Sequence, residues 1–276
     1  MKIVTDTSTL YSPKEGKDLG IIVLPLSVTV NKQTWKEFAE ISSKEFVKLV
    51  RDGGIPTSSQ PSVGETMEVF ENEKEELLVI SMADGLSGTY QSSVGARESI
   101  EDNEHIHCIN SRTLCGPHRY MVNKAIKMKE EGKSFEEIKA EMLSLTEKHI
   151  SFLIPSDFDF LKRGCRLTPV AATIGGLLKI VPVMTQTEDG RRLEKFAMKR
   201  TLKAAVSEIC KKLEEFGVNE DYLISVSHAD VEEQATEVME WIKKKFPNTK
   251  IELLELSPAF ITQGGPGCIA VQAIKL

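Results

Sequence analysis

The amino-acid sequence predicts an α/β protein made of two α/β domains. Short runs rich in β-branched and other apolar residues alternate with amphipathic stretches of helical spacing, a pattern typical of α/β folds. The chain has 276 residues, enough for two domains of moderate size, and 41% of them are hydrophobic. We expect residues 1–155 to form an N-terminal domain and residues 156–276 a C-terminal domain. The last strand is a candidate to return to the first domain.

Strands are expected where apolar runs lie between turn residues. These runs occupy residues 2–5, 21–29, 77–82, 105–109, 150–155, 179–186, 222–227, 250–256 and 268–274. A further strand is expected at 195–199, where Arg200 follows its last residue.

Helices are expected between these strands. Ser42 with Glu45, and Ser134 with Glu137, have the spacing of a capping box, and each pair is followed by apolar residues on one helical face. Two longer helices are predicted at 202–216 and 231–246, where apolar residues recur at helical spacing. We interpret these apolar stripes as faces that pack into the core.

Composition and charge exclude several classes of protein. The formal net charge is -6, and no stretch combines Lys and Arg with aromatic residues, so a nucleic-acid partner is not expected. No apolar run reaches the ~20 residues that a membrane-spanning helix requires. Met1 leads directly into a predicted strand without the features of a signal peptide, which favours a cytoplasmic protein.

The cysteines and histidines predict neither a disulfide framework nor a metal site. The five cysteines are widely and irregularly spaced, and none forms a C-x-x-C pair. His105 and His107 alternate along a predicted strand and therefore share a face, but no third ligand is evident nearby. Packing or surface roles are the more economical interpretation of these histidines.

Two hydroxyl-rich loops are the best candidates for chemistry. The first is 56–62, and the second is 81–91, which directly follows the strand 77–80. In the second loop, Gly85 and Gly88 allow a tight turn, and unpaired N–H groups at the start of the following helix can bind an anion. The alternative is that Ser87 and Thr89 only cap that helix. The sequence alone leaves both interpretations open.

Enzyme templates match these loops poorly. Residues 85–89 read Gly-Leu-Ser-Gly-Thr, so the last glycine of the hydrolase motif G-x-S-x-G is replaced by Thr89. His228 could serve as a base, but no acid precedes it in a suitable context. The turn after the first strand lacks G-x-G, and no P-loop is present. No catalytic residue is therefore assigned, although a serine esterase that uses Ser87 remains an alternative.

Two arginines could neutralise a bound anion. Arg166 lies between Gly164 and an apolar stretch that runs on to 174–178, and Arg200 follows the predicted strand at 195–199. Arginine can bind a carboxylate or a phosphate with two hydrogen bonds. Each arginine could equally lie in solvent. The protein could also bind another small anionic metabolite.

Taken together, these segments resemble the DegV family. The resemblance rests on Thr5-Asp6-Thr7-Ser8, on the loops 57–62 and 85–92, on Phe160-Leu161-Lys162-Arg163-Gly164-Cys165-Arg166, on Val226-Ser227-His228-Ala229 and on Gly265-Pro266-Gly267. They occur in the family's order and span essentially the whole chain.

The resemblance implies a non-catalytic protein with one long-chain fatty acid buried between its two domains. It implies no cofactor other than this ligand. Carried over by position, the carboxylate binds Thr57, Ser58, Ser87 and the Gly88 amide, while Arg166 and Arg200, with Thr89, have supporting or partner-facing roles. Some family members present the acid to the catalytic subunit of a fatty-acid kinase for phospholipid synthesis.

The sequence departs from the family pattern at two places. The T-S-Q-P-S motif reads Ser58-Ser59-Gln60-Pro61-Ser62, which keeps the hydroxyl and loses its methyl group. The usual histidine two residues before Gly265-Pro266-Gly267 is Gln263, which can donate a hydrogen bond to the carboxylate but cannot titrate. We therefore expect carboxylate binding to survive this change, and a role that requires a protonatable group to be lost.

Overall fold

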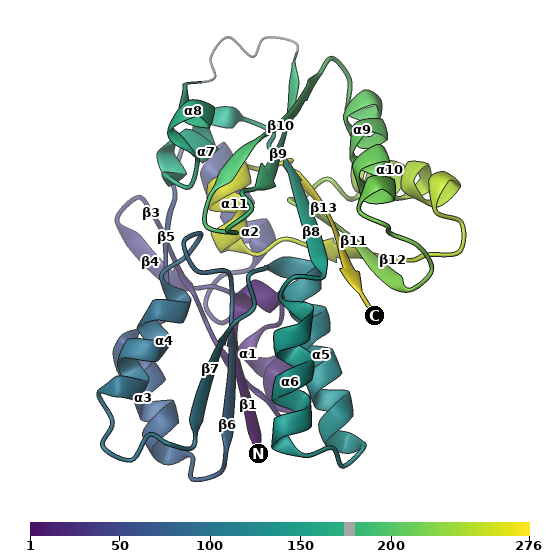
Figure 1. Cartoon of the computed structure of the whole chain (residues 1–276). Coiled ribbons are helices and arrows are strands. Elements are labelled where there is room, and N and C mark those ends of the chain that lie inside the picture. Colours follow the sequence, from purple (N-terminus) through teal and green to yellow (C-terminus); the bar gives the residue numbers. More distant parts are fainter. Residues whose placement is uncertain (174–179) are drawn as a thin grey trace.

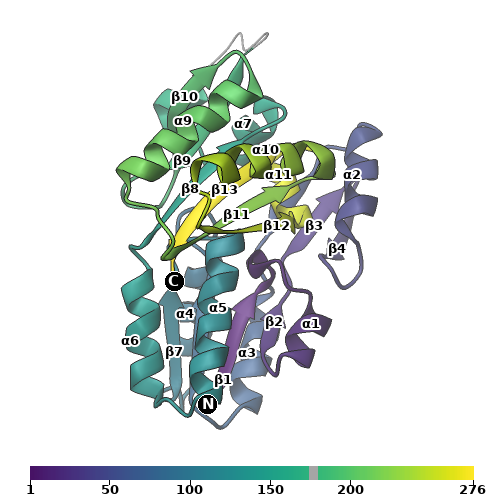
Figure 2. The same cartoon turned by 90° about the vertical axis from the view of Figure 1, so that its right-hand side faces the viewer.

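The computed structural model describes residues 1–173 and 180–276, and in these parts the strands form three sheets (Figure 1). The four-stranded sheet has the order β2-β1-β6-β7, the six-stranded sheet the order β10-β9-β8-β13-β11-β12, and the three-stranded sheet the order β4-β3-β5. Figure 2 shows the six-stranded sheet above the four-stranded one, with α11 and β3 beside their junction.

The four-stranded sheet is parallel and covered on both faces. Its strands are β1 (Lys2–Asp6), β2 (Ile22–Leu24), β6 (Leu77–Ser81) and β7 (Ile106–Asn110). Alternate residues of each strand pack to opposite sides. One side contacts α3 (Val63–Asn72) and α4 (Thr89–Glu98), and the other contacts α5 (Cys115–Glu130) and α6 (Phe135–Leu145).

The strand order reverses between β1 and β6, because β1 has the preceding β2 on one side and the later β6 on the other. In open parallel sheets, ligands bind beyond the carboxyl ends of the strands at such a reversal. Here β1 continues into a short 3-10 helix, η1 (Thr7–Thr9), and β6 continues into the loop that carries Ser87. The topology therefore places the second hydroxyl-rich loop where ligand binding is expected.

The six-stranded sheet is mixed. Its strands are β8 (His149–Ile154), β9 (Val181–Gln186), β10 (Leu193–Lys199), β11 (Tyr222–His228), β12 (Lys250–Glu255) and β13 (Ile269–Lys275). One face packs on α9 (Leu202–Glu215) and α10 (Glu232–Lys245) through residues such as Val226 and Val271. The alternate residues, including Ser151 and Gln272, lie on the other face.

The three-stranded sheet is antiparallel and formed by β3 (Ser27–Val30), β4 (Gln33–Lys36) and β5 (Thr57–Ser59). It shares a hydrophobic core with α2 (Ser43–Arg51) and α11 (Pro258–Gly264). The remaining helices are α1 (Pro13–Asp18), α7 (Phe158–Gly164) and α8 (Pro169–Ala172). Helix α11 thus joins the end of the chain to a sheet from its beginning.

The predicted α/β class is confirmed, and so are the helices that rested on local signals. Both predicted capping boxes form, at Ser42 with Glu45 and at Ser134 with Glu137. The predicted strand at 21–29 is wrong in its continuity: it splits into β2 and β3 around Pro25, which has no N–H for a ladder. Strand β5 lies inside the first hydroxyl-rich loop, and the sequence analysis did not anticipate it.

Two expectations fall partly outside the described residues. Residues 174–179 contain the Gly175-Gly176 part of the arginine segment and the first residue of the strand predicted at 179–186. The rest of that strand is β9, which begins at Val181.

The sheets bear on the expected division of the chain at residue 155. Strand β8 ends just before this position, yet it pairs with β13 and β9 in the six-stranded sheet. The last strand, β13, lies between β8 and β11, and its expected return to the first domain stays a prediction. The division into 1–155 and 156–276 stays a prediction.

Candidate functional site

A cavity of about 240 Å³ lies where the three sheets meet. A single water occupies ~30 Å³ of liquid, so the space suits an organic ligand better than one trapped water. The wall contains residues from β5, β8, β9, β13 and α11 and from the loop after β6. The lining residues used below are Ser58, Gln60, Met82, Leu86, Ser87, Leu114, Cys115, Ser151, Phe152, Leu153, Arg166, Met184, Thr185, Gln186, Leu193, Phe260, Gln263 and Gln272.

Ser87 belongs to the loop between β6 and α4 and lines the cavity. The tight turn before it needs a glycine, because Gly85 has a φ of 88°. The Ser87 hydroxyl lies 2.8 Å from the Thr89 hydroxyl and accepts a hydrogen bond from the Thr89 amide at 3.3 Å. Gly88 is the N-cap residue of α4 and is exposed. Ser87 therefore both lines the cavity and supports the start of the helix.

Ser58 comes from β5 and lines the cavity from the opposite hydroxyl-rich segment. Its hydroxyl accepts a hydrogen bond from the Thr262 hydroxyl at 3.3 Å. Thr57 is exposed and is not among the lining residues, whereas its neighbours Ser58 and Ser59 both are. The two loops meet at Gly88, where a Cβ would lie only 2.4 Å from Gln60 Oε1.

Arg166 supplies a cation at the same end of the cavity. It follows α7, which ends at Cys165 in the left-handed conformation. Its Nε donates to the Leu86 carbonyl at 2.9 Å and its Nη1 to the Gly164 carbonyl at 2.5 Å. Burial lowers the pKa of the guanidinium. Within the described parts of the chain, it forms no ion pair with a carboxylate.

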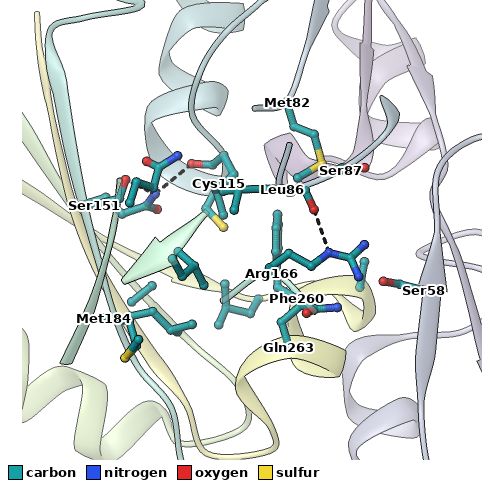
Figure 3. A pocket seen from close by; sticks show the side chains of 18 of the residues that line it. Ser58, Met82, Leu86, Ser87, Cys115, Ser151, Arg166, Met184, Phe260 and Gln263 are labelled. Atoms are coloured by element: carbon teal, nitrogen blue, oxygen red, sulfur yellow. Dashed lines mark hydrogen bonds between the residues drawn. The ribbon is translucent and has the colours of Figure 1, made fainter. Parts of the chain in front are cut away.

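Gln263 completes this group from α11. Its Nε2 donates to the Thr262 hydroxyl at 3.0 Å, while its Oε1 is buried beside Gly164, where a Cβ would lie 2.0 Å away. No hydrogen-bond partner for this oxygen lies among the described residues. Contacts thus run from Ser87 through Leu86, Arg166, Gly164, Gln263 and Thr262 to Ser58. We call the side chains of Ser58, Ser87, Arg166 and Gln263 the polar end of the cavity (Figure 3).

The other predicted site residues lie elsewhere. Thr89 is buried and reaches the cavity only through its hydrogen bond with Ser87. Arg200 is exposed just after β10, seven residues beyond Leu193, the residue of that strand that lines the cavity. Its predicted role toward a partner stays a prediction.

The remainder of the wall is mostly apolar. Met82, Leu86, Phe152, Met184 and Phe260 all line it. Across the cavity from Arg166, Figure 3 shows Met184 and Ser151. Ser151 lies within a second polar patch, formed with Thr185, Gln186 and Gln272, which the sequence analysis missed. The available signal was Gln272, a polar residue in the otherwise apolar run Ile269–Ile274.

A second polar group is buried beneath the cavity. Asp6 accepts hydrogen bonds from the Ser8 amide at 2.9 Å and the Met82 amide at 3.1 Å. His118 Nδ1 lies 2.7 Å from the Ser8 hydroxyl, and burial lowers the pKa of this imidazole. Glu37 accepts from the Thr7 hydroxyl and from the Ala259 amide. We call Asp6, Thr7, Ser8, Glu37 and His118 the buried network.

Glu37 differs from the rest of the buried network in its proton affinity. The carboxyl is fully buried, and the loss of solvation raises its pKa to about 7, although the hydrogen bonds from Thr7 and Ala259 oppose the shift. Its bond to Ala259 joins the end of β4 to the first turn of α11. Helix α11 also carries Gln263, so this carboxyl helps to position the polar end of the cavity.

The geometry gives Ser87 no base. Its hydroxyl bonds to Thr89, and no histidine is among the residues that line the cavity in the described chain. His228 Nδ1 accepts instead from the Val231 amide at 3.4 Å. In residues 1–173 and 180–276, no cluster of His, Cys, Asp or Glu could hold a metal ion, and no helix is long and apolar enough to cross a membrane.

The fold is that of an α/β protein with a mainly apolar cavity, whose wall carries a polar end around Arg166 and a second polar patch around Gln272. The chain belongs to the DegV family. It matches over residues 1–276 the family model described as an uncharacterised protein of the DegV family. A DegV domain-containing protein from Halalkalibacterium halodurans is 32% identical, with 98% of this chain and 96% of that protein covered.

Solved structures agree with this assignment. DegV from Bacillus subtilis, described as a fatty acid binding protein, is 27% identical, with a TM-score of 0.86 and coverage of 100% of this chain and 99% of that one. A DegV family protein from Thermus thermophilus, described by its fatty acid binding, is 26% identical with the same TM-score and the same coverage.

Proposed function

We propose that this protein binds a long-chain fatty acid in the cavity and carries it to the catalytic subunit of a fatty-acid kinase. The observation that carries the proposal is a mostly apolar cavity with Arg166 at one end, an arginine that forms no ion pair with a carboxylate among the described residues. The similar proteins from B. subtilis and T. thermophilus, both described as fatty acid binding, support this choice of ligand.

The apolar wall provides the affinity. Burial of each methylene contributes roughly 0.8 kcal/mol, so a tail of ~16 carbons gains on the order of 10 kcal/mol before the entropy of binding is subtracted. Met184, Phe152 and Phe260 offer side chains without charge along the wall. A small phosphorylated metabolite would leave this surface uncovered, which disfavours that alternative.

The polar end of the cavity would orient the fatty acid by binding its carboxylate. A carboxylate moved from water into a protein without partners costs at least several kcal/mol. Arg166 already has its Nε and one Nη held by backbone carbonyls, so its position is fixed before a ligand arrives. A carboxylate beside it would also receive hydrogen bonds from Ser58, Ser87, Gln263 Nε2 and the amides at the start of α4. Thr57 is left out of this proposal because its side chain is exposed.

The carrier role is supported by access to the polar end. Ser59, Gln60 and Gly88 surround it and are exposed, so a partner could reach the carboxylate while the tail stays buried. Beyond Arg166, helix α8 exposes Val170, which is 81% accessible. This exposed apolar side chain, four residues beyond Arg166, is one part of the docking surface that we propose. We place the kinase on this surface and on Arg200.

The ligand is tested first on the purified protein. Native mass spectrometry is expected to show a co-purified long-chain acid that dissociates on denaturation. In titrations with hexadecanoic acid, Ser87→Ala is expected to weaken binding about fivefold, because the variant loses one hydrogen bond to the carboxylate. Arg163→Ala serves as control, since Arg163 is exposed and stacks over Phe160. Equal and negligible effects of both variants would contradict the proposed site.

The partner requires a separate test. With ATP and a bacterial fatty-acid kinase catalytic subunit, the loaded protein is expected to support acyl-phosphate formation. Arg200→Glu is expected to reduce this rate at least tenfold (about 1.4 kcal/mol) without changing acid affinity. Lys211→Glu makes the same charge change at an exposed position of α9. An unchanged rate in Arg200→Glu would remove Arg200 from the docking surface.

A further inference from the structure

A buried glutamine lies at the other polar patch of the cavity wall. Gln272 is only 1% exposed, lines the cavity and belongs to β13, where its neighbours Val271 and Ala273 are apolar. In the sheet it lies opposite Ser151 of β8. The sheet does not require a glutamine at this position, because the hydrogen bonds between its strands are made by the backbone.

The hydrogen bonds of Gln272 fix the orientation of its amide. Its Nε2 donates to the Leu114 carbonyl at 3.0 Å and to the Ser151 hydroxyl at 2.9 Å. A carbonyl oxygen can only accept, so the nitrogen and not the oxygen must face Leu114. The oxygen Oε1 is therefore left on the other side, and no partner for it lies in the described chain.

Ser151 has an unused hydrogen-bond donor, which complements the unused acceptor of Gln272. Its oxygen accepts from Gln272, and its backbone carbonyl accepts from the Thr185 hydroxyl at 2.9 Å. No acceptor for the hydroxyl proton of Ser151 is found among its described neighbours. One unused acceptor, Gln272 Oε1, and one unused donor, the Ser151 hydroxyl, thus lie on adjacent side chains of the wall.

An unsatisfied buried acceptor is unfavourable, and such groups are normally satisfied by water or a ligand. A hydroxyl group can donate one hydrogen bond and accept another. A single hydroxyl on a ligand could therefore donate to Gln272 Oε1 and accept from Ser151. A methylene at the same place leaves both groups unpaired.

We propose that Gln272 and Ser151 select a hydroxylated long-chain acid, with the hydroxyl on the acyl chain at a distance from the carboxylate. This inference rests on the proposed fatty-acid binding and specifies its substrate class. Ser151 and Arg166 lie on opposite sides of the cavity in Figure 3, so an acid with its carboxylate at Arg166 would bring the middle or far part of its chain to Ser151.

The test compares acids that differ in one hydroxyl group. Dissociation constants are measured for octadecanoic acid, 10-hydroxyoctadecanoic acid and 12-hydroxyoctadecanoic acid, and for hexadecanoic acid and 16-hydroxyhexadecanoic acid. At least one hydroxy acid is expected to have a dissociation constant about fivefold lower than that of its parent acid, because it forms one added hydrogen bond. If every parent binds as well as its hydroxy acids, a water satisfies Gln272 and the proposal is wrong.

Variants separate this proposal from fatty-acid binding in general. Gln272→Met keeps the side-chain length without the amide, and it is expected to abolish the preference for the hydroxy acid while the parent acid binds as well or better. Ser151→Ala removes the hydroxyl that would donate to the ligand, together with its acceptance from Gln272 Nε2, and it tests the same preference if Gln272→Met does not fold. Gln33→Met, at an exposed position of β4, is the matched control.

The two proposals fail in different ways. A preference that persists in both cavity variants would overturn the role of Gln272 and Ser151, while fatty-acid binding would stand. If no acid of the panel binds to the wild-type protein, the proposed function fails as well.

Discussion

The buried network and the polar end of the cavity are both rich in polar side chains, but they differ in how completely these are paired. Asp6 and Glu37 each accept two hydrogen bonds from other parts of the chain. At the polar end, Arg166 has no carboxylate partner in the described chain, and Gln263 Oε1 accepts no hydrogen bond there. Because buried polar groups are normally paired, the first group is complete without a ligand and the second is not. The difference separates side chains whose partners lie within the fold from side chains that remain available to the ligand we propose.

The largest effect is expected from breaking the buried network. Asp6→Ala leaves the amides of Ser8 and Met82 without an acceptor, and each loss costs about 1–3 kcal/mol. We expect the free energy of unfolding, measured in urea, to fall by about 4 kcal/mol. Asp18→Ala, at an exposed position in α1, is the control and is expected to change it by less than about 0.5 kcal/mol. If Asp6→Ala lowers the free energy of unfolding by as little as the control does, the Asp6 carboxylate does not have this structural role.

Glu37 predicts a specific dependence of stability on pH. Its pKa rises from 4.5 to about 7 on folding. Between these values the unfolded chain releases a proton that the folded protein keeps, so the contribution of Glu37 to stability is greatest below pH 4.5 and is lost as the pH rises to 7. The total is on the order of 3 kcal/mol, from 1.36 kcal/mol for each pKa unit.

Glu37→Gln isolates this contribution, since other groups also titrate in the range. The difference in unfolding free energy between variant and wild type is expected to change by roughly 3 kcal/mol between pH 4.5 and pH 7.5, in favour of the variant. Parallel stability curves for the two proteins would show that Glu37 titrates as it does in the unfolded chain.

Short-range signals account for the part of the fold that the sequence predicted. The capping boxes at Ser42 and Ser134 involve residues three positions apart, and the stripes of α9 and α10 depend only on helical periodicity. The strand at 21–29 failed at Pro25 because the long-range pairing of β2 and β3 in separate sheets is not encoded in their apolar character.

The sequence predicted the loops of the candidate site, but not the contacts between residues that are far apart in the chain. The hydroxyl-rich segments were visible, but the sequence could not show that Ser58 lines the cavity while the adjacent Thr57 does not. Glu37 and Ala259 are 222 positions apart, so no local pattern could connect them. Gln272 gave a local signal, but only the fold shows that its oxygen lacks a partner.

At the polar end, replacing Arg166 is expected to affect binding more than stability. Arg166→Met removes the cation, and a hydrogen-bonded charge contributes about 1.5–3 kcal/mol, so the affinity for hexadecanoic acid is expected to fall roughly 10- to 100-fold. The free energy of unfolding is expected to change by less than about 1 kcal/mol, because the cost of burying the guanidinium offsets its hydrogen bonds to the Leu86 and Gly164 carbonyls. Arg163→Met, which alters an exposed arginine of the same segment, is the control. Unchanged affinity in Arg166→Met would mean that the carboxylate binds elsewhere.

The smallest expected effect comes from a pair of variants on one strand. Ser58→Ala removes a neutral hydroxyl that lines the cavity, so the affinity for hexadecanoic acid is expected to fall about threefold with little change in stability. Thr57→Ala removes a hydroxyl from the adjacent residue, whose side chain is exposed, and is expected to leave the affinity unchanged. The resemblance to the DegV family assigned both residues to the carboxylate, but in the structure Ser58 lines the cavity and Thr57 does not. A larger loss of affinity in Thr57→Ala than in Ser58→Ala would reverse the assignment and place the carboxylate on the outer face of β5.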